Sequence, residues 1–285
     1  MKFYTDVASE IVSNKFKVEE RKLDYGCTSV QIKIDSVKKS QFYGKPKGEY
    51  FSIFCDNLFY LAPIVSDFIA EELSKYLKSK IYKLTKKKSN KVLVACLGNG
   101  NLVCDSLGQK VFEKLIVCRQ NFNDNTLYAI NTNVYGKTNI KSVDYIKAIV
   151  NEICPDICIV LDALCSQSIT RIASCIQVCD SGILAGGAIN RTDKILISQK
   201  TLGVPTLCIG VPLVVRVESL FNEFISNITS EELLEEDELY TQYKNIIVAP
   251  KNIDILVKQS ASILAQAINS AVLNLSKKEQ EKLTF

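Results

Sequence analysis

The sequence predicts an α/β protein, built as a three-layer sandwich around a mostly parallel central sheet, with a small N-terminal β-rich extension. The chain has 285 residues, of which 47% are hydrophobic, and it can therefore bury a sizeable core. From residue 92 onwards, short and strongly apolar runs alternate with segments of helical spacing. Such runs are typical of strands that are covered on both faces, as in a parallel sheet. We expect one domain over residues 1–285, with its core in 92–215.

The N-terminal part is more polar than the rest and contains two strand-like pieces, at 29–34 and 50–55. Apolar residues then recur at helical spacing and predict a helix over about 62–84. The lysine-rich stretch 83–91 follows and is expected to be a solvated connector.

The remaining elements follow from the alternation of apolar and helical patterns. Strands are predicted at 92–98, 127–131, 157–164, 176–182 and 206–212. Helices are predicted at 105–114, 141–153, 166–174 and, at the end of the chain, about 254–280. The acidic stretch 230–240 is expected to lie on the surface.

The composition excludes several classes of chemistry. The chain has no histidine, which rules out Ser-His-Asp and Cys-His nucleophiles and zinc held by histidine. Catalysis would therefore rest on carboxylates, Lys, Tyr, Ser, Thr or Cys, and we expect no metal and no cofactor. The net charge of +4 does not by itself indicate nucleic acid as a direct partner.

Cysteine usage and hydropathy suggest a cytoplasmic protein. Most of the 11 cysteines stand inside apolar runs, without a CxxC pair, which favours reduced, buried thiols. The apolar runs are too short for a transmembrane helix, and there is no signal peptide, so no membrane partner is expected.

Three aspartates stand at or near the ends of predicted strands: Asp105, Asp162 and Asp180. In open α/β sheets, sites form at the carboxyl edge of the strands. Asp162 is the most unusual, because its neighbours are apolar and an ionised carboxylate is costly there without partners.

Two interpretations of these aspartates are open. If the strands of Asp105 and Asp162 are neighbours, both carboxyl groups reach one crevice, where two carboxyls sharing a proton can activate water. Alternatively, Asp105 caps the following helix and Asp162 orders a turn. The glycines of GNGN (98–101) do not form a GxGxxG or Walker pattern, so a nucleotide site is poorly supported.

Several segments together resemble the germination protease family, the spore endopeptidases that degrade small acid-soluble spore proteins. CLGNGNLVCDSLGQKV (96–111) resembles the GLGN and TPDALGP block of that family. PDICIVLDALCSQSITRIASCIQVCDSGI (155–183) resembles its IDALA and DTGI block, and TLGVPTLCIGVPLVV (201–215) its LGIPVIAIGVPTVV block. VAPKNID (248–254) is similar to VTPKEVD, and YTDVASE (4–10) to the RTDLA segment.

The resemblance implies an atypical aspartic protease with a fold similar to that of hydrogenase-maturation peptidases. The two essential aspartates of the family match Asp105 and Asp162. One would act as the base for water attack on a peptide carbonyl, and the other would supply a proton. The substrate-binding residues that we expect at strand ends and turns are Asn99, Asn101, Asp180, Gly186 and Gly187.

The resemblance also implies an inactive precursor, a homotetramer and a location in the spore core. YTDVASE is similar to the T-E-[FI]-A-S-E motif that the family cuts in its substrates. We therefore expect self-cleavage between Asp6 and Val7, which would remove residues 1–6 as a pro-segment.

The sequence departs from the family pattern at three places. Val103 and Cys104 replace Thr-Pro before the first aspartate, residues 165–167 read CSQ in place of ASR, and the PGSGVGN turn is LAGGAIN. Two alternatives therefore stand beside the protease: a hydrogenase-maturation-type peptidase, and a non-proteolytic spore protein of the same fold.

Overall fold

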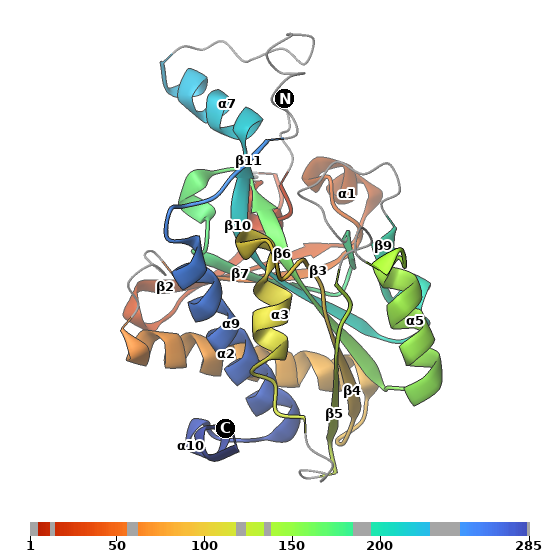
Figure 1. Cartoon of the computed structure of the whole chain (residues 1–285). Helices are drawn as coiled ribbons and strands as arrows, with labels where there is room; N and C mark the ends of the chain where they lie inside the picture. The colour runs from red at the N-terminus through yellow and green to blue at the C-terminus, as the bar shows by residue number, and fades with distance from the viewer. Residues whose placement is uncertain are drawn as a thin grey trace.

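The computed structural model describes residues 5–11, 15–55, 62–117, 124–133, 138–184, 195–228 and 246–283. Within these residues, the main sheet has nine strands in the order β1-β2-β3-β7-β10-β6-β4-β5, with β11 beside β10 (Figure 1). Its strands are β1 (Glu19–Lys22), β2 (Cys27–Ile34), β3 (Gly48–Cys55), β4 (Lys91–Cys96), β5 (Thr126–Asn131), β6 (Ile157–Ser166), β7 (Cys175–Cys179), β10 (Thr206–Arg216) and β11 (Ile247–Val248).

The centre of the sheet is parallel and its N-terminal side is antiparallel. β5, β4, β6 and β10 pair in parallel, each with its neighbour in the order given above. β7, β3, β2 and β1 continue the same sheet in antiparallel pairs. The α/β prediction with N-terminal strands is confirmed, and these strands extend the central sheet. A small hairpin of β8 (Ile183–Leu184) and β9 (Leu196–Ile197) lies apart from it.

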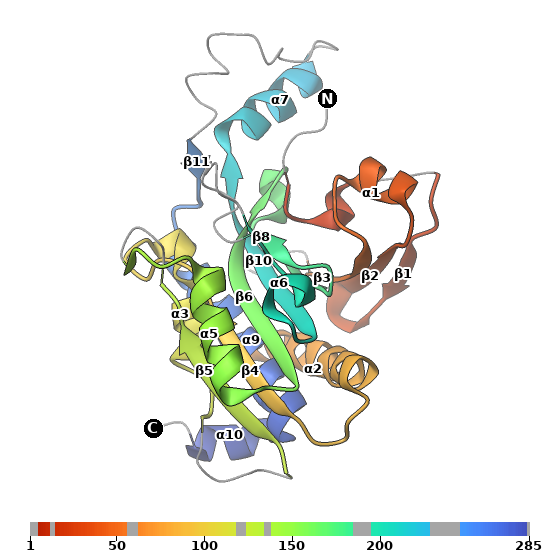
Figure 2. The same cartoon turned by 90° about the vertical axis from the view of Figure 1, so that its right-hand side faces the viewer.

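Helices cover both faces of the sheet, as Figure 2 shows from the side. One core cluster joins one face of the strands to α2 (Pro63–Thr85), α3 (Leu107–Phe112) and α9 (Ile253–Leu273). A second cluster joins the other face to α1 (Val37–Tyr43), α5 (Ser142–Ile153) and α6 (Gln199–Leu202). Successive residues of a strand point to opposite faces. For example, Val94 of β4 belongs to the first cluster and Leu93 to the second.

Two predicted helices differ from the structure. The helix expected at 166–174 is wrong, because β6 runs on to Ser166 and only the 3-10 turn Ile169–Arg171 follows. β7 lies on the other side of β10 and runs antiparallel to it, so the chain needs no crossover helix there. The helix expected at 254–280 is two helices, because Asn274 takes a left-handed conformation (φ 58°) between α9 and α10 (Lys277–Leu283).

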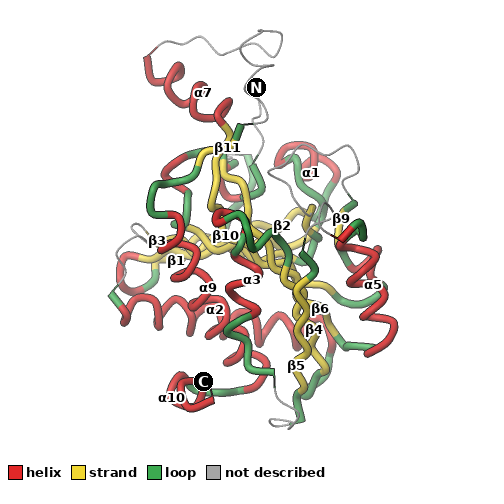
Figure 3. Tube along the Cα trace, in the orientation of Figure 1, coloured by secondary structure: helices red, strands yellow, loops and turns green. Residues whose placement is uncertain are grey.

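The strand predicted at 206–212 is longer than expected and passes through Pro212. The pairing of β10 with β6 shifts register between Pro212 and Val214, which is where a strand tolerates a residue without an N–H. After β10, helix α7 (Val217–Ile228) leaves the sheet at this end (Figure 3). In the described ranges, no helix is long and apolar enough to cross a membrane.

Candidate active site at the carboxyl edge of the parallel strands

Asp162 lies on the central strand β6, at the point where the neighbouring strand β4 ends. The last pair between the two strands is Cys96 with Leu161, and the Leu97 N–H donates to the Leu161 carbonyl oxygen at 2.8 Å. Asp162 is the next residue, and it is 2% exposed. Its Oδ1 accepts a hydrogen bond from the N–H of Ala163 at 2.9 Å. The carboxyl group is therefore buried at the carboxyl edge, where α/β sheets form their sites.

A tight turn after β4 holds Asp105. The Asn99 N–H donates to Asp105 Oδ2 at 2.8 Å, and the Asp105 N–H donates to the Leu102 carbonyl oxygen at 2.8 Å. Gly98 adopts a φ of +106°, and a Cβ at this position would lie 2.1 Å from the Asp105 carbonyl oxygen. Only glycine tolerates both the positive φ and the close contact, so Gly98 allows the backbone of the turn to pass close to Asp105.

The capping interpretation of Asp105 does not fit this geometry. The residue before α3 is Ser106, and no side chain caps the helix there. The Asp105 carboxylate instead accepts from Asn99, in the preceding turn. The 3-10 turn Val103–Asp105 packs against β6, β10 and α9. The structure thus brings the elements of Asp105 and Asp162 together at one edge of the sheet.

Burial sets the electrostatics of Asp105. Loss of solvent raises the pKa of its carboxyl group above the ordinary value, and the hydrogen bond from Asn99 offsets part of that rise. A raised pKa favours the protonated form of a carboxyl group, the form that can act as an acid. The use of Asp105 and Asp162 as a catalytic pair stays a prediction.

The two asparagines of the turn have visible structural roles. The N–H of Asn99 binds Asp105, and its Oδ1 accepts a hydrogen bond from the Asn101 N–H at 3.1 Å. Asn101 itself is exposed. Their contact with a substrate stays a prediction.

Asp180 is engaged in a buried ion cluster on the α2 side. Lys80 Nζ lies 2.7 Å from Asp180 Oδ2 and 2.5 Å from Glu49 Oε2, and the Lys80 side chain is 4% exposed. The Glu49 N–H also donates to Asp180 Oδ1 at 2.7 Å. Although burial raises the pKa of Glu49, the ammonium groups of Lys80 and Lys83 bring it down to about 2. Asp180 thus has partners of its own, and a role in substrate binding stays a prediction, as it does for Gly186 and Gly187, which lie outside the described residues.

The expected processing site lies against the same strand as Asp162. The Asp6 N–H donates to the Cys165 carbonyl oxygen at 2.8 Å, and the Cys165 N–H donates to Asp6 Oδ2 at 2.9 Å. Val7 is fully buried, in a small cluster with Phe54, Leu164 and Cys175. The Asp6–Val7 bond is therefore covered in this conformation.

Sequence reasoning missed one polar residue close to this edge, Gln177 of β7. It is 5% exposed, it stands opposite Gly210 of β10, and Gly210 in turn stands opposite Asp162. The signal was present, because Gln177 is the only polar residue in the apolar run CIQVC, as Asp162 is in ICIVLDAL.

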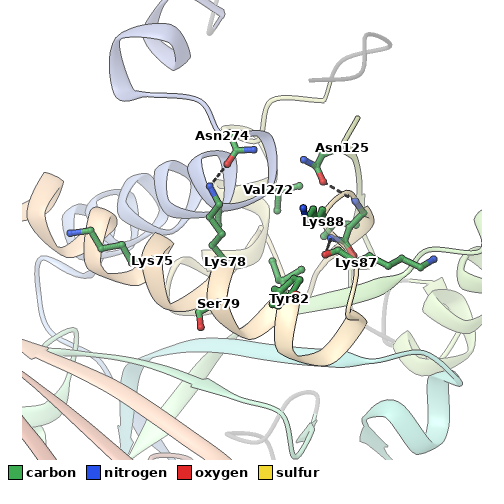
Figure 4. A pocket seen from close by; sticks show the side chains of 13 residues that line it. Lys75, Lys78, Ser79, Tyr82, Lys87, Lys88, Asn125, Val272 and Asn274 are labelled. Atoms are coloured by element: carbon green, nitrogen blue, oxygen red, sulfur yellow. Dashed lines mark hydrogen bonds between the residues drawn. The ribbon is translucent and has the colours of Figure 1, made fainter. Parts of the chain in front are cut away.

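A cavity of about 520 Å³ lies away from these residues, between α2, α9 and the connector before β4. Four lysines line it: Lys75, Lys78, Lys87 and Lys88 (Figure 4). Lys78 donates to Asn274, and Lys87 pairs with Asp156. Within the described part of the chain, no three Cys, Asp or Glu residues gather where they could hold a metal ion.

The fold and this edge define an α/β protein whose candidate chemistry rests on carboxyl groups at the ends of parallel strands. The model of the germination protease family matches residues 5–238. The chain belongs to this family of proteases.

Relatives support this assignment over nearly the whole chain. The chain is 30% identical to a germination protease of Caldanaerobacter subterraneus subsp. tengcongensis, over 90% of its length and 89% of the relative. It is 28% identical to that of Clostridium acetobutylicum, over 91% and 88%. Among solved structures, a NiFe hydrogenase maturation protease from Thermococcus kodakarensis aligns with a TM-score of 0.33 and 18% identity, over 66% of this chain and 98% of that one.

Proposed function

We propose that this protein is an aspartate-dependent endopeptidase that degrades small acid-soluble spore proteins in the spore core during germination. The observation that carries the proposal is the position of Asp162. A buried carboxyl group stands at the carboxyl edge of the central strand, and the turn of Asp105 packs against that strand. Membership of the germination protease family supports the substrate class.

The proposed reaction uses both carboxyl groups on one peptide bond. The ionised carboxylate accepts a proton from water as the water oxygen attacks the carbonyl carbon. The protonated carboxyl group gives its proton to the amide nitrogen, and the C–N bond then breaks to leave a new carboxyl and a new amine. The raised pKa of Asp105 supports a pair in which one carboxyl group holds a proton while the other is ionised.

We further propose that the protein is made as a precursor that loses residues 1–6 by its own activity. The bond between Asp6 and Val7 lies against β6, the strand that carries Asp162. Because Val7 is buried, the segment must leave its place before the bond can be cut.

The test is incubation of the purified chain with a small acid-soluble spore protein, followed by mass spectrometry of both. We expect one internal cut in the substrate and loss of residues 1–6 from the enzyme. Asp105→Asn and Asp162→Asn each lower both rates by at least about 100-fold, because each removes one proton-transfer group.

A matched control separates this effect from a loss of charge. Asp254 is an exposed aspartate in the first turn of α9, so Asp254→Asn is expected to cut at the normal rate. Substrate that stays intact with every variant, including the unchanged chain, would favour a non-proteolytic spore protein of this fold. Full activity in Asp162→Asn would reject the carboxyl mechanism.

A further inference from the structure

The cavity of about 520 Å³ lies where the end of α2 meets the end of α9 and the first residues of β4 (Figure 4). This volume is in the range of cavities that hold small organic ligands. Val92 of β4 and Asn125, which precedes β5, line it. Asp105 follows the other end of β4, and Asp162 lies beside that end. The cavity is therefore at the opposite edge of the parallel strands from the candidate active site.

Part of the cavity wall is apolar. Ile81 of α2, Val92 of β4 and Val272 of α9 line it, and each of these side chains is 5% exposed or less. Tyr82 also lines the cavity and is 55% exposed. An apolar group that enters the cavity leaves water and packs against these side chains, which is favourable. This wall therefore suits the apolar body of an organic molecule.

The charged side chains that line the cavity are all positive. Among the described residues, no Asp or Glu lines it, and the lining includes the lysines Lys75, Lys78, Lys87 and Lys88. Two of these charges are balanced by carboxylates outside the lining. Lys75 pairs with Glu72 at 2.9 Å, and Lys87 pairs with Asp156 at 2.5 Å.

The other two charges, on Lys78 and Lys88, have no carboxylate within ion-pair distance among the described residues. Lys78 donates instead to the neutral amide of Asn274, as the dashed line in Figure 4 shows. The C-terminal ends of α2 and α9 contribute roughly half a negative charge each. Two ammonium groups exceed that sum, so the cavity favours a negatively charged group.

One acceptor in the cavity wall lacks a hydrogen bond. Asn90 lines the cavity and is 7% exposed. Its backbone N–H donates to Asn125 Oδ1 at 2.8 Å, and its Nδ2 donates to the Lys87 carbonyl oxygen at 3.3 Å, which fixes the orientation of the amide. Its Oδ1 accepts no hydrogen bond in the part of the chain that the structure describes. A buried acceptor without a donor is costly, so a ligand that supplies a donor removes this cost.

We propose that this cavity, which we call the lysine cavity (Lys78, Lys88, Asn90, Val92 and Val272), binds a small organic anion that has an apolar body and a hydrogen-bond donor. The two lysines pair with the negative group, the valines pack against the body, and Asn90 accepts from the donor. The inference goes beyond the proposed function and does not depend on it, because the cavity lies away from both candidate catalytic aspartates.

Energy transfer from a single tryptophan tests where such an anion binds. The chain has no tryptophan, so Tyr82→Trp places the only one on the cavity wall. The probe is anilinonaphthalene sulfonate, which carries an aromatic body, a sulfonate and an amine N–H. Probe in the lysine cavity is expected to quench the tryptophan emission. Probe on the exposed phenylalanines of α7 would quench it far less, because α7 projects from another part of the molecule (Figure 1).

Removal of single charges tests which side chains bind the anion. Lys78→Gln and Lys88→Gln, each made in the Tyr82→Trp chain, are expected to weaken probe binding roughly five-fold, which is the worth of one ion pair at about 4 Å in water. Lys258 is an exposed lysine of α9 that does not line the cavity. Lys258→Gln makes the same change in net charge and is expected to leave the affinity unchanged.

Ser79 allows changes of opposite sign at one position. It is exposed on α2 and lines the cavity. Ser79→Lys is expected to tighten probe binding roughly five-fold, and Ser79→Glu to weaken it by a similar factor. Lys and Glu both favour a helix, so neither change is expected to disturb α2. Near-ultraviolet circular dichroism checks the fold, and Lys75→Trp takes the place of Tyr82→Trp if that variant does not fold.

The outcomes separate this inference from the proposed function. Equal affinities in Lys78→Gln, Lys88→Gln and Lys258→Gln, or a tryptophan emission that the probe does not quench, overturn the lysine cavity even if the protein degrades spore proteins. Inorganic phosphate that displaces the probe at an equal concentration would also overturn it, because phosphate has no apolar body. Quenching with the expected order of affinities, in a chain that cuts nothing, supports the lysine cavity and rejects the protease.

Discussion

Carboxyl groups in this molecule differ in pKa because their neighbours differ. Two lysine ammonium groups bring the pKa of Glu49 down to about 2, in spite of its partial burial. Burial raises the pKa of Asp105, and the backbone N–H of Asn99 offsets part of the rise. Burial also raises the pKa of Glu10, against hydrogen bonds from Thr5, Gln167 and Ser168 and the charge of Arg171. Burial, hydrogen bonds and charged neighbours together therefore decide in which direction each carboxyl pKa moves.

The raised pKa of Glu10 makes docking of residues 5–10 depend on pH. A group whose pKa is higher in the docked state stabilises docking below its free pKa, and this contribution is lost as pH rises through the docked pKa. We expect the Ala8 amide, which is bound to Gln177, to be better protected from hydrogen exchange at pH 4 than at pH 7. Glu10→Gln removes this difference, and protection that stays constant in the unchanged chain would contradict it.

At the scale of elements, a buried ion cluster joins α2 to β3 and to the end of β7. Lys80 of α2 reaches Glu49 of β3 and Asp180, which follows β7. Two carboxylates around one buried ammonium are stable only while the ammonium remains, since each would otherwise be an unpaired charge out of water. The cluster fixes the helix over the antiparallel half of the sheet.

Lys80→Met is therefore expected to lower the free energy of unfolding by about 3–5 kcal/mol, measured by urea denaturation at pH 7. Lys83 pairs with the same Glu49, but its side chain is 59% exposed. Lys83→Met is expected to cost less than about 1 kcal/mol. Similar losses of unfolding free energy in the two variants would show that burial of the ammonium group does not determine how much each ion pair stabilises the protein.

The elements that the sequence predicted well are those whose burial is local. The run 157–164 predicts β6 because a strand covered on both faces needs apolar residues at every position. The helix predicted at 166–174 was wrong. The isoleucines and the alanine of this segment also fit a helical spacing, but its conformation depends on where β7 pairs. Local patterns cannot show which strands become neighbours.

The contrast between local sequence patterns and strand pairing also applies to the candidate site. Asp162 could be chosen as a candidate from the sequence because a charged residue inside an apolar run is costly without partners. The glycines of GNGN also marked the turn of Asp105 correctly. Gln177 also stood out as a polar residue in an apolar run, but its position two strands from Asp162 depends on the register of three strands and could not be predicted.

At the scale of the whole molecule, α7 presents apolar side chains at one end of the sheet. Phe224 is 67% exposed and Phe221 is 44% exposed, and the helix projects from the body of the protein (Figure 1). Exposed apolar surface of this kind is typical of contacts between copies of a chain. The homotetramer that the family resemblance suggests stays a prediction, and α7 is the contact that we expect.

The molar mass, measured by light scattering after gel filtration, tests whether the chain forms a tetramer through α7. The unchanged chain is expected at about four times its mass of 31.8 kDa. Phe224→Asp is expected to shift the protein to a smaller species, because the added charge opposes burial of the helix. Ile64 of α2 is exposed to a similar extent, at 58%, and Ile64→Asp is expected to leave the mass unchanged. Monomer in the unchanged chain would reject the tetramer.

The complete burial of Val7 gives the proposed processing step a direction. Hydrolysis after Asp6 would turn the amide nitrogen of Val7 into an ammonium ion, inside a cluster of apolar side chains. Such an ion is far more stable in water than in that cluster, so the new chain end would move out to solvent and would not return. The proposed processing step would then be irreversible without an external source of energy.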